Sequence, residues 1–287
     1  MMETRLVAAC PSDKVMRMAA AQPRVVLITG ASSGIGRACA EHLAALGYRV
    51  YGASRHPAAI SGVEPIAMDV TDDASVREAV TRIIDREGRI DILVNNAGVA
   101  LAGAVEDTTV EEARKQFDVN FFGVLRVCRA VLPTLREQRS GYIVNIGSIA
   151  GLVAVPYQGF YSASKFALEG FSESLRHELK PFGIHVVLIE PGDHRTGLTV
   201  NRIRTAASET NPAYRDRFQI AAARMEADEQ NGPEPDAIAR LLHRIVKKAR
   251  PRLRYTAGPV PQRAAVWLKR LLPYSLVEKV IEFYYSR

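Results

Sequence analysis

The chain has 287 residues, of which 47% are hydrophobic, and a formal net charge of +7. This composition suits one large α/β domain or two small ones, and the dispersed basic residues give no reason to expect nucleic-acid binding. The three cysteines, Cys10, Cys39 and Cys128, are far apart, which excludes a disulfide framework or a metal site and favours a reducing, cytoplasmic location. No window reaches the roughly 18 apolar residues of a membrane span.

Residues 1–23 are mixed and polar, and we expect a disordered N-terminal extension without a secretory signal. Residues 24–29 form a β-branched apolar run that is typical of a strand buried on both faces of a parallel sheet. A glycine-rich turn at 30–36 follows, and a helical pattern at 37–46 ends at Gly47.

A strand, a glycine turn and a helix are the context in which backbone can approach a pyrophosphate at a helix N-terminus. The spacing is G-x-x-x-G-x-G, and the alternative is a tight turn with glycines for packing. We therefore predict cofactor contacts from the turn, at Gly30, Ser32, Ser33, Gly34, Ile35 and Gly36.

The second predicted strand, 48–53, indicates which dinucleotide binds. NAD-dependent enzymes usually place an acidic residue at its end to hold the ribose 2′-hydroxyl, but none lies between residues 48 and 63. Arg55 ends the strand and Arg37 follows the last glycine, and a guanidinium can pair with a 2′-phosphate. This favours NADP(H) over NAD(H); the alternative is that Arg55 is a solvent-exposed loop charge.

Further candidates follow the next strands. Asp69 and Val70 come after a short predicted strand at 64–68, and a helix is expected at 72–86. A strand at 90–94 runs into the small-residue turn Asn95-Asn96-Ala97-Gly98.

A long helix is predicted over 111–132, ending at Pro133. Asn120 lies inside this helix, where its amide competes for backbone groups. It could mark a local kink that holds a water, or it could be a partly exposed side chain.

Tyr161 and Lys165 lie four residues apart in a helix predicted to run to about residue 180, and Ser148 follows a strand predicted at 142–146. Positions i and i+4 share a helix face, so the lysine ammonium would favour the phenolate. The ordinary tyrosine pKa is about 10, and lowering it to near neutral pH requires roughly 3–4 kcal/mol of stabilisation of the phenolate. One lysine and a cationic cofactor ring could supply this stabilisation. A tyrosine and lysine at this spacing are otherwise an ordinary amphipathic pair.

A sixth strand is predicted at 184–189, before Pro191, Gly192 and Thr196. The glycine turn, Asn95, Ser148 and Pro191 thus all follow strands of an alternating β-α pattern. Ligands bind at the carboxyl ends of the strands in open α/β sheets, so one sheet edge should collect every candidate.

Together these motifs closely resemble those of the short-chain dehydrogenase/reductase family, over residues 24–196 and less distinctly to 257. The resemblance rests on TGASSGIG at 29–36, NNAG at 95–98, Asn120, Ser148, YSASK at 161–165 and Pro191-Gly192. It implies a single Rossmann-type domain over 24–257, in which a doubly wound parallel sheet of about seven strands in the order 3-2-1-4-5-6-7 carries helices on both faces.

The resemblance also implies roles for these residues. Tyr161 would be the general acid/base, Ser148 would orient the substrate oxygen, and Lys165 would lower the tyrosine pKa and bind the nicotinamide ribose. Asn120 would hold a water that links Lys165 to solvent. Further cofactor contacts are implied at Asp69 and Val70 (adenine), Asn95 (adenosine-side ribose), Thr196 (carboxamide), and Ala97, Gly98, Pro191 and Gly192.

The residues around these motifs suggest a hydrophobic alcohol or ketone substrate, and the likeness is nearest to steroid- and retinol-dehydrogenase-like members. Residues 193–235 break the β-α rhythm and are expected to form a substrate lid, in which His194 is read as a loop histidine rather than an extra acid/base. The amphipathic tail 258–287 could be a cap over the substrate, a subunit contact or a membrane-surface helix, in that order of preference. Five side chains could line an apolar pocket: Leu152, Val153, Val155, Tyr157 and Phe160.

The sequence therefore predicts an NADP(H)-dependent oxidoreductase that interconverts a secondary alcohol and a carbonyl, and a homodimer or homotetramer. Two alternatives stay open: a non-catalytic NADPH-sensing regulator on the same fold, and a nucleotide-sugar epimerase.

Overall fold

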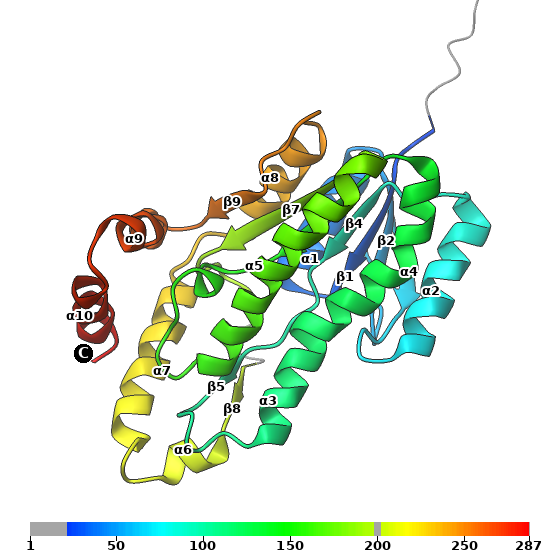
Figure 1. Cartoon of the computed structure of the whole chain (residues 1–287). Coiled ribbons are helices and arrows are strands. Elements are labelled where there is room, and N and C mark those ends of the chain that lie inside the picture. Colours follow the sequence, from blue (N-terminus) through cyan, green and yellow to red (C-terminus); the bar gives the residue numbers. More distant parts are fainter. Residues whose placement is uncertain (1–21, 198–201, 287) are drawn as a thin grey trace, which may run out of the picture.

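The computed structural model describes residues 22–197 and 202–286 (Figure 1). The extension expected at 1–23 lies almost wholly outside these residues. A parallel sheet of seven strands forms the centre of the protein, in the order β3-β2-β1-β4-β6-β7-β9, as predicted. Its strands are β1 (Val25–Thr29), β2 (Arg49–Ser54), β3 (Val63–Ala67), β4 (Ile92–Asn95), β6 (Gly141–Ile146), β7 (Ile184–Pro191) and β9 (Arg254–Ala257).

Helices cover both faces of the sheet because alternate strand residues point to opposite sides. Val25 and Leu27 of β1 face one core, and Val26 and Ile28 face the other. The first core is closed by α2 (Asp73–Glu87), α4 (Gly123–Gln138) and α5 (Gly159–Leu179). The second is closed by α1 (Gly34–Ala45) and α8 (Asp236–Val246). The result is a single Rossmann-like domain.

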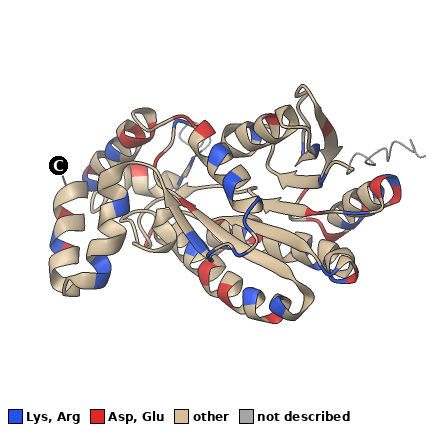
Figure 2. Ribbon diagram, turned by 90° about the horizontal axis from the view of Figure 1, so that it is seen from above, with Lys and Arg blue, Asp and Glu red and all other residues tan. Residues whose placement is uncertain are grey.

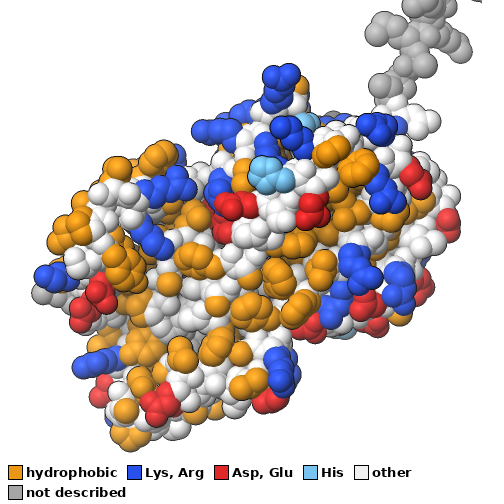
Figure 3. Space-filling model, viewed as in Figure 1, with side chains coloured by type: hydrophobic (Ala, Val, Ile, Leu, Met, Phe, Trp, Pro, Cys, Tyr) orange, Lys and Arg blue, Asp and Glu red, His pale blue; other side chains and the backbone are white. Residues whose placement is uncertain are grey.

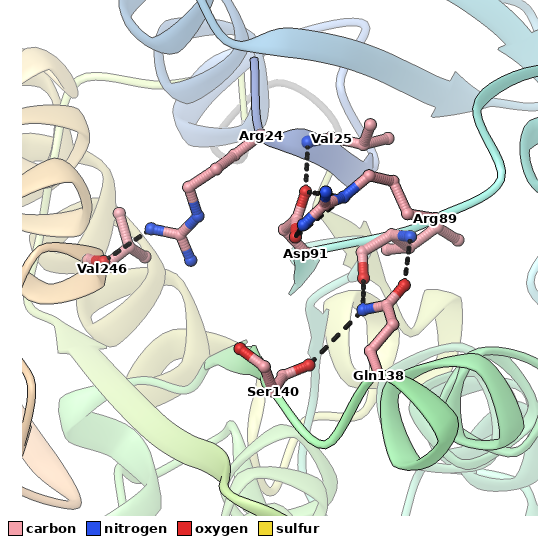
Figure 4. Close-up of polar contacts among 8 residues, drawn as sticks. Arg24, Val25, Arg89, Asp91, Gln138, Ser140 and Val246 are labelled. Atoms are coloured by element: carbon pink, nitrogen blue, oxygen red, sulfur yellow. Dashed lines mark hydrogen bonds and ion pairs between the residues drawn. The ribbon is translucent and has the colours of Figure 1, made fainter. Parts of the chain in front are cut away.

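The helix predicted over 111–132 differs in the structure. It begins as α3 (Val110–Phe117), passes through a π-helix at Asp118–Phe122, and continues as α4. The expectation that it ends at Pro133 is wrong, since Pro133 lies inside α4. The turn after the proline is held in place because Leu135 is fully buried and Gln138 exchanges two hydrogen bonds with the Ile90 backbone, at 2.7 and 3.1 Å (Figure 4).

Polar contacts tie together the amino ends of the strands, at the edge away from the predicted site. Asp91 accepts a hydrogen bond of 2.7 Å from the backbone N–H of Val25 and pairs with Arg89 (Figure 4). Arg24 donates to the backbone oxygen of Val246 at 2.8 Å. These contacts fix β1 against β4 and α8 at the amino ends of the strands. They do not occupy the opposite edge, where the carboxyl ends of the strands and the predicted ligand site lie.

The segment after β7 and the tail add smaller elements at that carboxyl edge (Figure 1). Within the described residues, none of the helices is long and apolar enough to cross a bilayer. Acidic and basic residues are interspersed along the helices (Figure 2). The added elements are β8 (Ile203–Arg204), α6 (Ala206–Thr210), α7 (Arg215–Gln230), α9 (Val260–Leu271) and α10 (Tyr274–Tyr285). β8 pairs with β5 (Leu101–Ala102), a short strand between β4 and α3.

Candidate active site

The glycine turn between β1 and α1 lies tightly against the turn that follows β4. Gly30 and Gly34 have φ of 66° and 55°, the left-handed region that favours glycine. A Cβ on Gly36 would lie 2.3 Å from the Gly30 oxygen, so the third glycine is needed for close packing. The Ser33 side chain makes no capping hydrogen bond in the described part of the chain, and the first N–H groups of α1 therefore face the turn.

Asn96 and Thr29 hold this turn, and neither was predicted as a site residue. The Asn96 amide donates to the backbone oxygens of Thr29 and Gly30, each at 3.0 Å. The Thr29 hydroxyl accepts from the N–H groups of Asn96 and Ala97, both at 3.0 Å. The pair of asparagines after a buried strand was the sequence signal that could have identified these hydrogen bonds between the two turns.

The two predicted 2′-phosphate ligands are exposed at this edge. Arg37, in the first turn of α1, pairs with Glu41 at 2.8 Å, and Arg55 follows β2. The pKa of Asp69 is lowered, chiefly by the Thr71 backbone N–H, with smaller contributions from the Thr71 hydroxyl and the charge of Arg55. Arg55 thus lies within electrostatic reach of the predicted adenine contact.

Asn95 and Val70 sit deeper than the sequence suggested. Asn95 is 2% exposed, and its amide donates to Asn145 Oδ1 at 2.9 Å. Asn145 donates in turn to Ser172 Oγ at 2.8 Å, so these side chains join β4, β6 and α5 inside the protein. Val70 packs against Gly123, where an added Cβ would be 2.9 Å from Val70 Cγ2. The Asn95 side chain is therefore not brought to the cofactor edge.

Asn120 is buried in the π-helix and faces α5. Its Oδ1 accepts from the Val99 N–H at 2.9 Å, and its Nδ2 donates to the Val99 oxygen at 3.0 Å and to Ser164 Oγ at 3.2 Å. Ser164 donates to the Tyr161 backbone oxygen at 2.7 Å. The local irregularity predicted at Asn120 is present and aims its amide at the turn of α5 that carries Tyr161.

Ser148, Tyr161 and Lys165 converge where β6 ends and α5 begins. The Ser148 hydroxyl accepts from the Ala150 N–H at 3.1 Å and is hydrogen bonded to the Tyr161 phenol. Lys165 Nζ lies 5.8 Å from the centre of the Tyr161 ring and donates to the Ile146 oxygen at 2.9 Å. The structure thus brings together all three, with Asn120 behind them.

Burial dominates the electrostatics of the pair. It raises the pKa of Tyr161 to about 12, against the opposing hydrogen bond from Ser148. It also lowers the pKa of Lys165 to about 8. The expected depression of the tyrosine pKa is therefore not produced by the protein groups alone, because desolvation of the phenolate outweighs them.

The loop after β7 closes over the glycine turn. Gly192 donates to the Ala257 oxygen at 2.7 Å, and a Cβ on Gly34 would lie 3.3 Å from Thr196 Cβ. His194 is buried and its Nδ1 bonds the Gly192 oxygen at 2.9 Å, which agrees with its reading as a loop histidine. A hollow of ≈ 390 Å³ opens beside this loop, lined among others by Gly34, Arg37 and Thr196.

The elements after β7 and the tail contact the loop between Ser148 and Tyr161. Tyr157, which has φ of 59°, packs against Phe218 of α7 in a tilted arrangement with ring centres 5.6 Å apart. Lys269 of α9 donates to the Leu152 oxygen at 2.5 Å, and Gln262 accepts from the Asp193 N–H at 2.9 Å. The tail is therefore anchored on the predicted substrate side.

Comparison with known proteins agrees with this fold. The family model described as short chain dehydrogenase matches residues 24–207. A 3-ketodihydrosphingosine reductase of Bacteroides thetaiotaomicron is 44% identical over 266 residues, which cover 92% of this chain and 99% of the relative. Retinol dehydrogenase 8 of Bos taurus is 36% identical over 255 residues, which cover 81% of this chain and 80% of the relative.

A solved short-chain dehydrogenase/reductase from Burkholderia phymatum, in complex with NAD, superposes with a TM-score of 0.75. It is 27% identical, and the match covers 90% of this chain and 95% of that structure. Fold, motifs and relatives define an oxidoreductase that acts on alcohol or carbonyl groups with a nicotinamide cofactor. The chain belongs to the short-chain dehydrogenase/reductase family.

Proposed function

We propose that this protein is an NADP(H)-dependent oxidoreductase that interconverts a secondary alcohol and a ketone on a hydrophobic chain. The observation that carries the proposal is the convergence of Ser148, Tyr161 and Lys165 at the carboxyl edge of the sheet, with the Asn120 amide directed at the same turn of α5.

The residues divide the chemistry as follows. A bound nicotinamide dinucleotide supplies the hydride transfer. Tyr161 Oη donates its proton to the substrate oxygen in reduction, and its phenolate accepts that proton in oxidation. The Ser148 hydroxyl orients the oxygen, and the Lys165 ammonium favours the phenolate and holds the nicotinamide ribose. Asn120, fixed by Val99 and Ser164, supports a water through which Lys165 exchanges protons.

The remaining cofactor contacts follow the carboxyl edge. The glycine turn and the N-terminus of α1 would hold the pyrophosphate, and Arg37 and Arg55 the 2′-phosphate. Pairing with a 2′-phosphate is supported because β2 does not end in the acidic residue that would hold a ribose 2′-hydroxyl and repel the phosphate. Arg37 would have to leave Glu41 to make this contact. The other proposed contacts are Gly30, Ser32, Ser33, Gly34, Ile35, Gly36, Asp69, Val70, the Asn95 backbone, Ala97, Gly98, Pro191, Gly192 and Thr196.

Several features support a long-chain ketone as substrate. The loop between Ser148 and Tyr161 is largely apolar, and α7 and α9 pack on it through Phe218 and Lys269. This arrangement supports residues 193–235 as a lid and the tail as a cap. The Bacteroides relative is named for a 3-keto long-chain base, and we propose that class for this chain, in the reductive direction.

We further propose a cytoplasmic homodimer or homotetramer. The two cysteines within the described residues are free and buried, which fits a reducing compartment. Phe122, in the π-helix that carries Asn120, and Phe166, on α5 with Tyr161, are exposed. Figure 3 shows hydrophobic side chains gathered on the face that α4 and α5 cover in Figure 1. Light scattering after gel filtration would measure the assembly.

A Tyr161→Phe variant tests the proposed chemistry. It should bind NADPH with an unchanged quench of protein fluorescence but lose most turnover of 3-keto long-chain substrates, by about 10²- to 10⁴-fold. Wild-type turnover in this variant would refute Tyr161 as acid/base. Binding without turnover by the wild type across alcohols and ketones would instead support an NADPH sensor, and conversion of a nucleotide sugar, followed by NMR, would support an epimerase.

A further inference from the structure

Glu190 is a fully buried acid placed directly behind Ser148. It precedes Pro191 in β7 and is 0% exposed. Its Oε2 accepts a hydrogen bond of 2.9 Å from the Ser148 backbone N–H. The carboxyl fits there because residue 147 is glycine: a Cβ at Gly147 would lie 2.5 Å from Glu190 Oε1. Glu190 therefore supports the turn that presents the Ser148 hydroxyl.

The second carboxyl oxygen of Glu190, Oε1, has another buried carboxyl group, that of Glu169, as its neighbour. Among the described residues, neither Glu190 Oε1 nor Glu169 Oε1 has a hydrogen-bond donor. The two carboxyl groups are nevertheless in hydrogen-bond contact with each other. Two ionised carboxylates cannot share a buried site without severe repulsion, and a buried acceptor without a donor is costly. A single proton between the two orphan oxygens removes both problems.

The neighbours place that proton on Glu190. Glu169 Oε2 pairs with the Arg254 guanidinium, which also pairs with Glu173, so a positive charge is in direct contact with Glu169. Within residues 22–197 and 202–286, Glu190 receives a hydrogen bond only from the Ser148 N–H, and the Lys165 ammonium, which also affects it, is bonded to Ile146. Burial first, and Glu169 second, raise the pKa of Glu190 well above its ordinary value.

We propose that Glu190 and Glu169 share one proton at neutral pH, and that this neutral Glu190 is a positioning residue that fixes Ser148 and leaves the Lys165 charge for Tyr161 and the cofactor. The inference rests on the proposed function for the roles of Ser148 and Lys165. An ionised Glu190 would instead attract the ammonium away from the reacting end. The charged groups that face the pair are Lys165 and Glu173 of α5 and Arg254 of β9.

Infrared difference spectroscopy tests the shared proton without any turnover. The resting wild-type protein at pH 7 should show a carboxylic-acid carbonyl band that is absent from Glu190→Gln. Glu173→Gln is the matched control, because Glu173 also pairs with Arg254 but is exposed, and it should keep the band. A carboxylate band in place of the acid band in the wild-type minus Glu190→Gln difference would overturn the proposal.

Steady-state kinetics with NADPH and a 3-keto long-chain substrate test the positioning role. A glutamine reproduces both hydrogen bonds of the protonated acid, so Glu190→Gln should keep kcat within about threefold, whereas Glu190→Ala leaves the Ser148 N–H unpaired and should lower kcat by about tenfold or more. NADPH affinity should be unchanged in both. Equal losses of kcat in both variants would overturn the positioning role. If Glu190→Ala does not fold, a large loss of kcat in folded Glu190→Gln is by itself enough to overturn it. Failure of the proposed function would appear separately, as absent wild-type turnover with the infrared band intact.

Discussion

Lys165 Nζ and the backbone oxygen of Ile146 form a hydrogen bond of 2.9 Å that joins α5 to the end of β6. The contact holds the ammonium against the end of β6, because Ile146 precedes Ser148 by two residues. Burial nevertheless lowers the pKa of Lys165 to about 8. A buried cation is thus kept in a place where it costs stability, as expected where position matters for catalysis.

Replacing this lysine should exchange activity for stability. Lys165→Met should lose at least about 100-fold in turnover and gain on the order of 1–3 kcal/mol in the free energy of unfolding at pH 7. The folded pKa lies below the unfolded one, so the unfolded chain binds more protons and wild-type stability rises between about pH 8 and the ordinary lysine value of 10.5. The advantage of the variant, measured by urea unfolding, should shrink over that window. A constant difference would show that the charge of Lys165 is not its cause.

The pH dependence of reduction should report the same group. As pH rises through about 8, Lys165 loses its charge, which in the proposed mechanism favours the phenolate and binds the ribose. The value of kcat/KM for the ketone should therefore fall on the alkaline side, in a step that is absent from the residual activity of Lys165→Met. A profile that stays flat to pH 9.5 in the wild type would contradict this assignment.

The two exposed arginines should set the choice of cofactor. Arg55→Glu and Arg37→Glu should each raise the KM for NADPH by about tenfold or more while leaving that for NADH nearly unchanged, because each removes a charge-assisted contact and adds repulsion to the 2′-phosphate. Arg114→Glu is the control, since Arg114 is exposed on α3 and pairs only with Glu111 among the contacts described. Tighter binding of NADH than NADPH by the wild type would refute the NADP(H) preference.

Asn96 should matter for cofactor affinity more than for chemistry. Asn96→Ala removes both donors to the backbone oxygens of Thr29 and Gly30 and loosens the glycine turn. We expect the Kd for the dinucleotide to rise by about tenfold, in line with about 1–1.5 kcal/mol for the lost contacts. At saturating cofactor, kcat should stay near wild type. A fall in kcat with unchanged Kd, measured by fluorescence titration, would argue against a role in holding the turn.

Much of this arrangement could be predicted because the motifs are local in sequence. The apolar runs located the strands, and the glycine turn and the Tyr161–Lys165 spacing, taken together with the other motifs, predicted two parts of the candidate site. What local patterns could not show depends on contacts between distant segments. Pro133 continues a helix because Leu135 and Gln138 hold the next turn, and the partner of Glu190 lies on another element. Asn95 and Asn96 look equivalent in sequence, yet the strand directs one side chain inward and the other to the glycine turn.

The position of β9 at the edge of the sheet has a consequence for synthesis of the protein. Until Arg254–Ala257 leaves the ribosome, β7 is an unpaired strand edge, and Glu169 lacks its arginine. The nascent chain therefore already carries the proposed catalytic residues while this aggregation-prone strand edge is exposed. Ribosome stalling beyond this strand, rather than before it, should mark the point at which the emerging polypeptide first becomes resistant to protease.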